Sequence, residues 1–181
     1  WHQEIRDIIV LKNNKGTEDN RVRKLDYSIQ LSALFYQRFI DNGKITLFSP
    51  HDVAGLYDSF GTESFDELYV KYENDDSIPK TQVDAQELIL DLLKERAETG
   101  RIYIMNIDHC NSHSSFTDKV EMSNLCQEIT LPTKPVQHID DEHGEIALCI
   151  LSAINIGKIR DVSDLETLCD LSVRSLDELI D

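Results

Sequence analysis

Basic residues are scarce in this sequence, which has 18 Lys and Arg against 34 Asp and Glu and a formal net charge of −16. A nucleic-acid surface needs clustered Lys and Arg, so we expect no nucleic-acid partner. No apolar run approaches the roughly 20 residues of a membrane span, and no signal peptide precedes Trp1, so we expect no membrane partner either. The four cysteines are scattered, which is typical of the reducing cytoplasm. The sequence therefore predicts a cytoplasmic protein.

Glycine is also sparse, and its arrangement excludes two common nucleotide sites. None of the seven glycines belongs to a G-x-G-x-x-G fingerprint or a P-loop, the two glycine-rich loops that cradle phosphates. We therefore expect no glycine-rich phosphate-binding loop in this chain.

Apolar spacing alternates between the periods of helices and strands. The clearest helix begins at Thr81 or Asp84 and ends at Gly100, and further helices are expected over residues 21–40 and from Ser163 onward. The predicted strands are the short apolar or β-rich runs at residues 44–48, 102–107, 124–131 and 145–150. Strands that alternate with helices indicate an α/β architecture with parallel pairing.

Residues 124–131 hold three side chains with complementary chemistry. Residues two apart in an extended segment point the same way, so a strand would place Asn124, Cys126 and Glu128 on one face. Glu can take or give a proton, Asn can orient a hydroxyl group, and Cys can act as a nucleophile or redox centre. On pattern alone, a half-buried strand with a polar face and an inert core cysteine is the simpler interpretation.

Several longer motifs resemble one enzyme family. The stretch S-N-L-C-Q-E-I-T-L-P-T-K-P at residues 123–135 and G-E-I-A-L-C at residues 144–149 resemble the active-site region of the large, catalytic alpha subunit of ribonucleotide reductase. Three further segments resemble the same family in the same order, at residues 11–16, 45–53 and 95–104. The resemblance is to the aerobic, two-subunit class I type of bacteria and their viruses.

This resemblance implies that the chain is an internal fragment of a longer subunit. Residues 1–181 would form a partial catalytic barrel domain, part of a ten-stranded α/β barrel whose other strands lie in absent N- and C-terminal parts. The family carries its radical cysteine on a loop inside the barrel, which implies a loop where periodicity predicts a strand at residues 124–131.

The resemblance also assigns roles to four residues. Cys126 matches the radical cysteine, Glu128 the carboxylate that takes the 3′-hydroxyl proton, and Asn124 the amide that binds the substrate hydroxyls. Cys149 matches one cysteine of the redox-active disulfide, whose partner lies outside this chain. Without the resemblance, Cys149 is most simply a core cysteine.

The implied activity is that of a ribonucleoside-diphosphate reductase, which makes deoxyribonucleotides by a thiyl-radical mechanism with dithiol oxidation. The segment itself would bind no cofactor and no metal. A metal-containing small subunit would supply the radical, thioredoxin or glutaredoxin would supply electrons, absent regions would bind nucleotide effectors, and the full subunit would be a homodimer. The fragment alone is expected to be inactive.

Two other functions stay open at this point. One is a non-catalytic nucleotide-binding or subunit-interaction module, against which the intact set of Asn124, Cys126, Glu128 and Cys149 argues. The other is a zinc-binding module that uses His109, Cys110 and His113, although no second ligand cluster stands at finger spacing.

Overall fold

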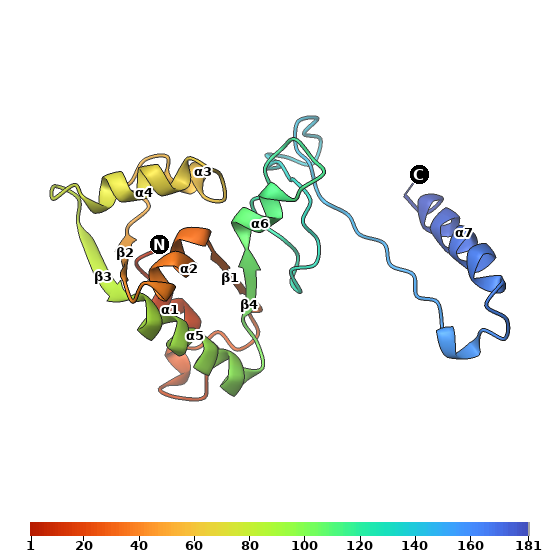
Figure 1. Ribbon diagram of the computed structural model, residues 1–181, viewed down its shortest axis with the longest axis horizontal. Coiled ribbons are helices and arrows are strands. Elements are labelled where there is room, and N and C mark those ends of the chain that lie inside the picture. Colours follow the sequence, from red (N-terminus) through yellow and green to blue (C-terminus); the bar gives the residue numbers. More distant parts are fainter. Residues whose placement is uncertain (181) are drawn as a thin grey trace.

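The structure is a computed structural model, and it describes residues 1–180. The elements up to α6 form one group, and α7 stands apart from them at the end of an extended segment (Figure 1). In chain order the elements are α1 (Ile5–Ile9), η1 (Glu18–Asn20), β1 (Ser28–Leu31), α2 (Ala33–Ile40), β2 (Lys44–Phe48), α3 (Leu56–Ser59), α4 (Phe65–Glu73), β3 (Lys80–Asp84), α5 (Ala85–Thr99), β4 (Tyr103–Asn106), α6 (Ile107–Ser112), η2 (Ile156–Lys158) and α7 (Asp164–Asp177).

The strands form two separate pairs, one nested inside the other along the chain. The outer pair, β1 and β4, is parallel, with Ser28 opposite Tyr103. The inner pair, β2 and β3, is antiparallel, with Lys44 opposite Asp84. The predicted α/β class and its parallel pairing are confirmed by β1 and β4, whereas the antiparallel pair was not anticipated. No barrel closes within residues 1–180.

Helix α5 covers the core of this group and forms where the sequence predicted a helix. The Asp84 carboxylate accepts hydrogen bonds from the backbone N–H of Gln86 (2.9 Å) and of Glu87 (3.2 Å), and Gly100 ends the helix at φ +65°. The buried side chains of the core come from both strand pairs and three helices: Ile9, Ile29, Leu31, Phe35, Ile45, Leu47, Ala85, Leu88, Ile89, Leu92 and Ile102.

The helix predicted over residues 21–40 is wrong in its first half. Residues 28–31 form β1 instead, with a burial pattern that alternates along the strand, and the helix begins only at Ala33. Ser32 caps that helix by accepting a hydrogen bond from the Phe35 N–H at 3.3 Å. The helical spacing of apolar residues across 25–36 was misleading because Ile29 and Leu31 also fit a strand with one buried face.

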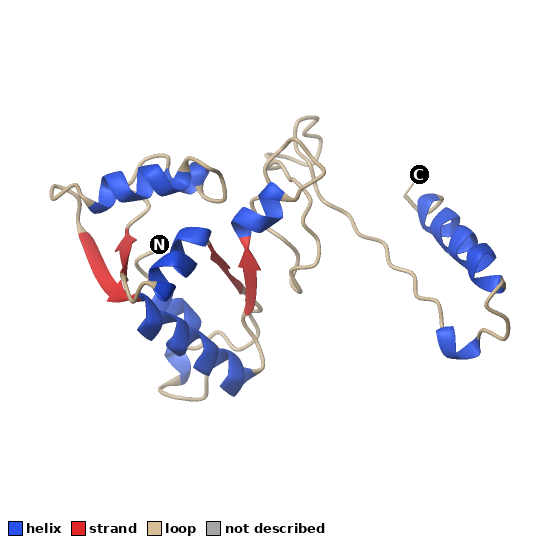
Figure 2. Cartoon of the chain, in the orientation of Figure 1, coloured by secondary structure: helices blue, strands red, loops and turns tan. Residues whose placement is uncertain are grey.

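After α6 the chain has little regular structure until α7, apart from the short η2 (Figure 2). The strand predicted at residues 145–150 is not formed: within the described chain, residues 146–154 make no backbone–backbone hydrogen bond. Large apolar side chains are exposed throughout residues 139–179, at Ile139, Ile146, Leu148, Leu151, Ile156, Val162, Val173 and Leu179. Helix α7 confirms the helix predicted after Ser163, yet it buries none of its residues. Among residues 1–180, no helix is long and apolar enough to cross a membrane.

Candidate functional site

A tight turn presents the central side chains of the candidate site. The backbone N–H of Gln127 donates to the Asn124 carbonyl at 3.2 Å, and Gln127 itself is left-handed at φ +66°. The Asn124 side-chain oxygen accepts the N–H of Ile129 at 3.1 Å, and the Ser123 hydroxyl donates to the Ile129 carbonyl at 2.5 Å. Residues 123 and 124 thus hold both ends of the turn together.

This turn corrects the strand predicted over residues 124–131. An extended segment has no i to i+3 hydrogen bond and no left-handed residue, so the even alternation of Asn124, Cys126 and Glu128 is lost. The Asn124 side chain closes the turn in competition with strand pairing, as Asn often does. Cys126 and Glu128 are both exposed in this turn.

A second contact brings Cys149 back toward the turn. Lys134 and Glu145 form an antiparallel bridge through two backbone hydrogen bonds of 3.1 and 3.0 Å. Their side chains also pair at 2.6 Å, and the hydrogen bond to Glu145 raises the pKa of Lys134. An antiparallel register at this bridge carries residues 148–149 toward residues 130–131 on the returning chain.

The returning chain and the turn meet at a hollow of about 430 Å³. Glu128 and Cys149 both line this hollow, together with residues 129–131 and the end of α6. Asn124 and Cys126 are not among its lining residues. The structure therefore brings two of the four sequence-predicted residues into one space and holds the other two in the adjoining turn.

The residues of the zinc alternative line this hollow from α6 and from the position directly after it. The rings of His109 and His113 lie 5.9 Å apart in an edge-on arrangement, and the His113 Nδ1 lies 3.0 Å from the His109 carbonyl. Burial raises the pKa of the Cys110 thiol. Within residues 1–180, no group of three or more His, Cys, Asp or Glu side chains is placed to hold a metal ion. The zinc alternative therefore has no support in the geometry.

Asn111 is a positioning residue that the sequence analysis missed. Its amide nitrogen donates to the carbonyls of Gly61 (3.0 Å) and Val120 (3.1 Å), and its oxygen accepts the Val120 N–H at 2.8 Å. These bonds fix the chain just before the turn onto α6. Gly61 permits the contact, because at φ +81° an added Cβ would lie 2.5 Å from Ile107 Cγ1 and 2.8 Å from the Asn111 amide nitrogen.

We expect Asn111→Ala to lower the free energy of unfolding by about 2–3 kcal/mol. The change removes three hydrogen bonds and leaves the backbone groups of Val120 without their partners, at about 1 kcal/mol for each bond. Urea unfolding followed by the fluorescence of Trp1, the single tryptophan, measures the effect. Amide exchange at Val120 should also accelerate. The control is Asn155→Ala at an exposed position, and equal stability of the two variants would contradict the role given to Asn111.

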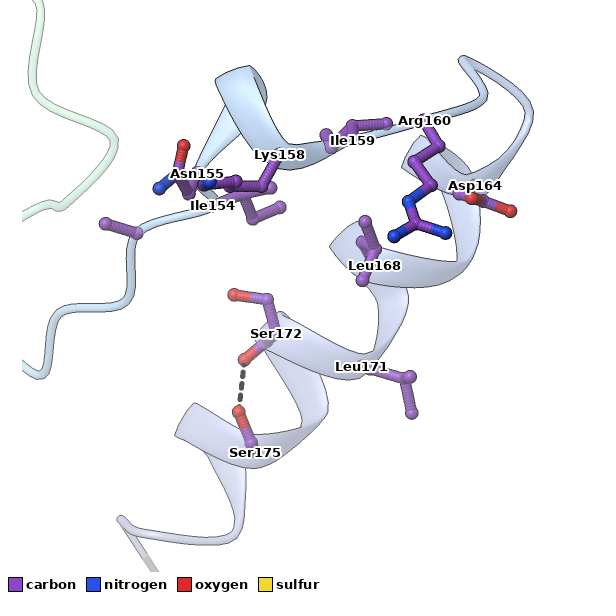
Figure 3. Close-up of a pocket in the computed structure, with 11 residues that line it drawn as sticks. Ile154, Asn155, Lys158, Ile159, Arg160, Asp164, Leu168, Leu171, Ser172 and Ser175 are labelled. Carbon is purple, nitrogen blue, oxygen red and sulfur yellow. Dashed lines mark hydrogen bonds between the residues drawn. The ribbon is translucent and has the colours of Figure 1, made fainter.

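Another hollow, of about 600 Å³, lies along α7 and is lined mainly by residues 153–160 and one face of the helix (Figure 3). Leu168, Leu171 and Ser172 face it from the helix, and Ser172 donates to the Ser152 hydroxyl at 2.8 Å. It contains none of the sequence-predicted site residues. We place the candidate site at the hollow beside α6, because a thiol and a carboxylate meet there.

Comparison with known proteins gives these motifs a family context. The family model described as the ribonucleotide reductase barrel domain matches residues 1–181. The alpha subunit of ribonucleoside-diphosphate reductase from Haemophilus influenzae is 59% identical, covering 100% of this chain and 25% of that protein. The corresponding subunit of Enterobacteria phage T4 is 42% identical over the same shares, 100% and 25%. The subunit alpha of reductase 1 from Escherichia coli is 55% identical over 75% of this chain and 18% of that protein. The chain spans about a quarter of the length of the first two relatives.

Proposed function

The chain belongs to the ribonucleotide reductase barrel-domain family, and from that membership we propose that it is the catalytic-core segment of a ribonucleoside-diphosphate reductase. The reaction reduces ribonucleotides to deoxyribonucleotides for DNA synthesis. One observation carries the proposal: Glu128 and Cys149 line a common hollow while Asn124 and Cys126 occupy the adjoining turn. A module that only binds nucleotides or another subunit has no physical need for this combination of groups.

In the proposed mechanism Cys126 carries a thiyl radical that removes the hydrogen at the 3′ carbon of the ribose. Glu128 takes the proton of the 3′ hydroxyl, which helps the 2′ hydroxyl leave as water. Asn124 supports this step through its amide, since its side-chain oxygen already accepts the Ile129 N–H and its NH₂ group is a donor to substrate hydroxyls. Cys126 later returns a hydrogen atom to the 3′ carbon.

Reduction at the 2′ carbon consumes two electrons, which we assign to Cys149 and a second cysteine outside this chain. The two thiols become a disulfide as the deoxynucleotide forms, and thioredoxin or glutaredoxin would reduce that disulfide for the next turnover.

The remaining partners follow from the family. A separate, metal-containing small subunit would supply the radical, and this segment would hold neither that metal nor the nucleotide effectors, which bind elsewhere in the subunit. The full subunit would be a homodimer. Dithiol chemistry requires a reducing compartment, and the four free cysteines of this chain suit the cytoplasm.

The proposal is tested by Cys149→Ser in a chimera, made by replacing the matched residues of the Haemophilus influenzae subunit with this chain. Hydrogen abstraction stays possible in this variant, but the electrons that complete the reaction are missing. We expect loss of sustained deoxynucleotide formation and release of free base from the nucleotide. The control is Cys169→Ser, which alters an exposed cysteine of α7 that does not line the hollow. Normal turnover of the Cys149→Ser chimera with dithiol reductant would contradict the assignment.

A further inference from the structure

The hollow beside α6 holds two cysteines from segments far apart in the sequence. Cys110 lies on α6, and Cys149 lies in the irregular segment that returns from the Lys134–Glu145 bridge. Neither Cys126 nor Cys169 lines this hollow. We propose that Cys110 and Cys149 form a reversible disulfide within this chain when a small-molecule disulfide is present. This site goes beyond the proposed function, which pairs Cys149 with a cysteine elsewhere, and it does not depend on reductase activity.

The surroundings of the two thiols differ, and this difference decides which thiol reacts first with the small disulfide. Cys149 is exposed, so a small disulfide can reach it from solvent. Cys110 is half-buried and packs against the cluster of Met105, Ile107 and Val120. The first reaction therefore takes place at Cys149, and Cys110 is the thiol that resolves it.

Bonding requires the segment around Cys149 to approach α6. A disulfide needs Cα atoms within about 7 Å of one another. Residues 146–154 make no backbone–backbone hydrogen bond within the described chain, so this segment can move toward α6 without breaking one. Helix α6 is held in place by Asn111 and by its packing, and it provides the fixed side of the pair.

The chemistry balances with oxidised glutathione as the oxidant. The Cys149 thiolate attacks one glutathione sulfur, forms a mixed disulfide and releases one glutathione thiolate. The Cys110 thiolate then attacks the Cys149 sulfur, forms the Cys110–Cys149 bond and releases the second glutathione thiolate. The two protein thiols lose two protons and two electrons, and oxidised glutathione becomes two molecules of reduced glutathione.

The second step has a predictable pH dependence. Burial raises the pKa of the Cys110 thiol, so the thiolate that attacks is scarce at neutral pH. The mixed disulfide on Cys149 should accumulate at about pH 7, and its conversion to the Cys110–Cys149 bond should be faster at about pH 9.

The test uses the full 181-residue chain, reduced and then incubated with oxidised glutathione, and only the monomer separated without reductant is digested. After free thiols are blocked, digestion without reductant and mass spectrometry identify the linked peptides. We expect a Cys110–Cys149 peptide to dominate in the unmodified chain and in the control Cys169→Ser. In Cys110→Ser, we expect a stable glutathione adduct on Cys149 in its place. The mapping in the unmodified chain decides the question even if Cys110→Ser does not fold.

A denatured sample separates the effect of the fold from that of chain length. In urea, pairing favours the shortest loops, so Cys110 should join Cys126, its nearest neighbour in sequence. A native sample that gives this same pattern, a dominant Cys126–Cys149 peptide, or no intramolecular link would overturn the proposal.

Discussion

A complete alpha subunit that carries this segment with Cys126→Ser should show no turnover. The proposed first step removes a carbon-bound hydrogen with a sulfur radical, and an O–H bond is much stronger than an S–H bond, so serine would not form the corresponding radical. The fold should be unaffected, because the hydrogen bonds of the turn come from Ser123, Asn124 and Gln127 and none of them uses the Cys126 side chain.

The Haemophilus influenzae chimera described above allows this measurement. Deoxynucleotide formation is followed over many turnovers, alongside the thermal unfolding of the unmodified and Cys126→Ser chimeras. Equal melting temperatures with no product from the variant are the expected result, and Cys169→Ser should keep full activity. Multiple-turnover reduction by a folded Cys126→Ser chimera would rule out the radical role of Cys126.

The second large effect concerns the 181-residue chain alone, which should have no reductase activity and should self-associate. Ile139 is 98% exposed, Leu151 79%, and Ile146 and Leu148 73% each, in a segment without regular structure. Burying one such side chain contributes about 1.5–3 kcal/mol, so these residues favour contact with any apolar surface. Cys126 and Glu128 are exposed in the same chain, where dissolved thiols and oxygen would quench a radical.

Sedimentation and the binding of a hydrophobic dye measure the association, and product formation with a radical-generating small subunit and a dithiol measures the activity. A variant with Ile146→Ser, Leu148→Ser and Leu151→Ser removes exposed apolar side chains that no core needs. It should bind less dye and sediment as a smaller species. An active, monomeric chain that binds no dye would contradict both parts of the expectation.

Signals within a short stretch of sequence predicted the helix and strands that those signals mark. Helix α5 begins at the Asp84 cap and ends at the left-handed Gly100, and both signals are visible in the sequence. Strand β2 occupies its predicted residues 44–48, and β4 lies within the predicted run. The pairing was less predictable, since the antiparallel partner of β2 is the polar strand β3.

The site shows the opposite case, in which the strand expected from alternation was wrong. Motif resemblance selected Asn124, Cys126, Glu128 and Cys149, but alternation in the sequence predicted a strand where Asn124 closes a turn. No local signal marked Asn111, whose partners Gly61 and Val120 are brought to it by the tertiary fold. The opposite charges of Lys134 and Glu145 around a connection containing Gly144 were the one signal that could have indicated the bridge.

The nesting of the strand pairs sets the order in which the chain can fold during synthesis. The partner of β1, which is β4, is made only after α2, β2, α3, α4, β3 and α5. At typical rates of translation, β1 waits roughly 4–15 s for β4. The inner antiparallel pair is complete before β4 leaves the ribosome. Within this chain the inner pair can therefore form before the outer pair, which closes only when β4 emerges.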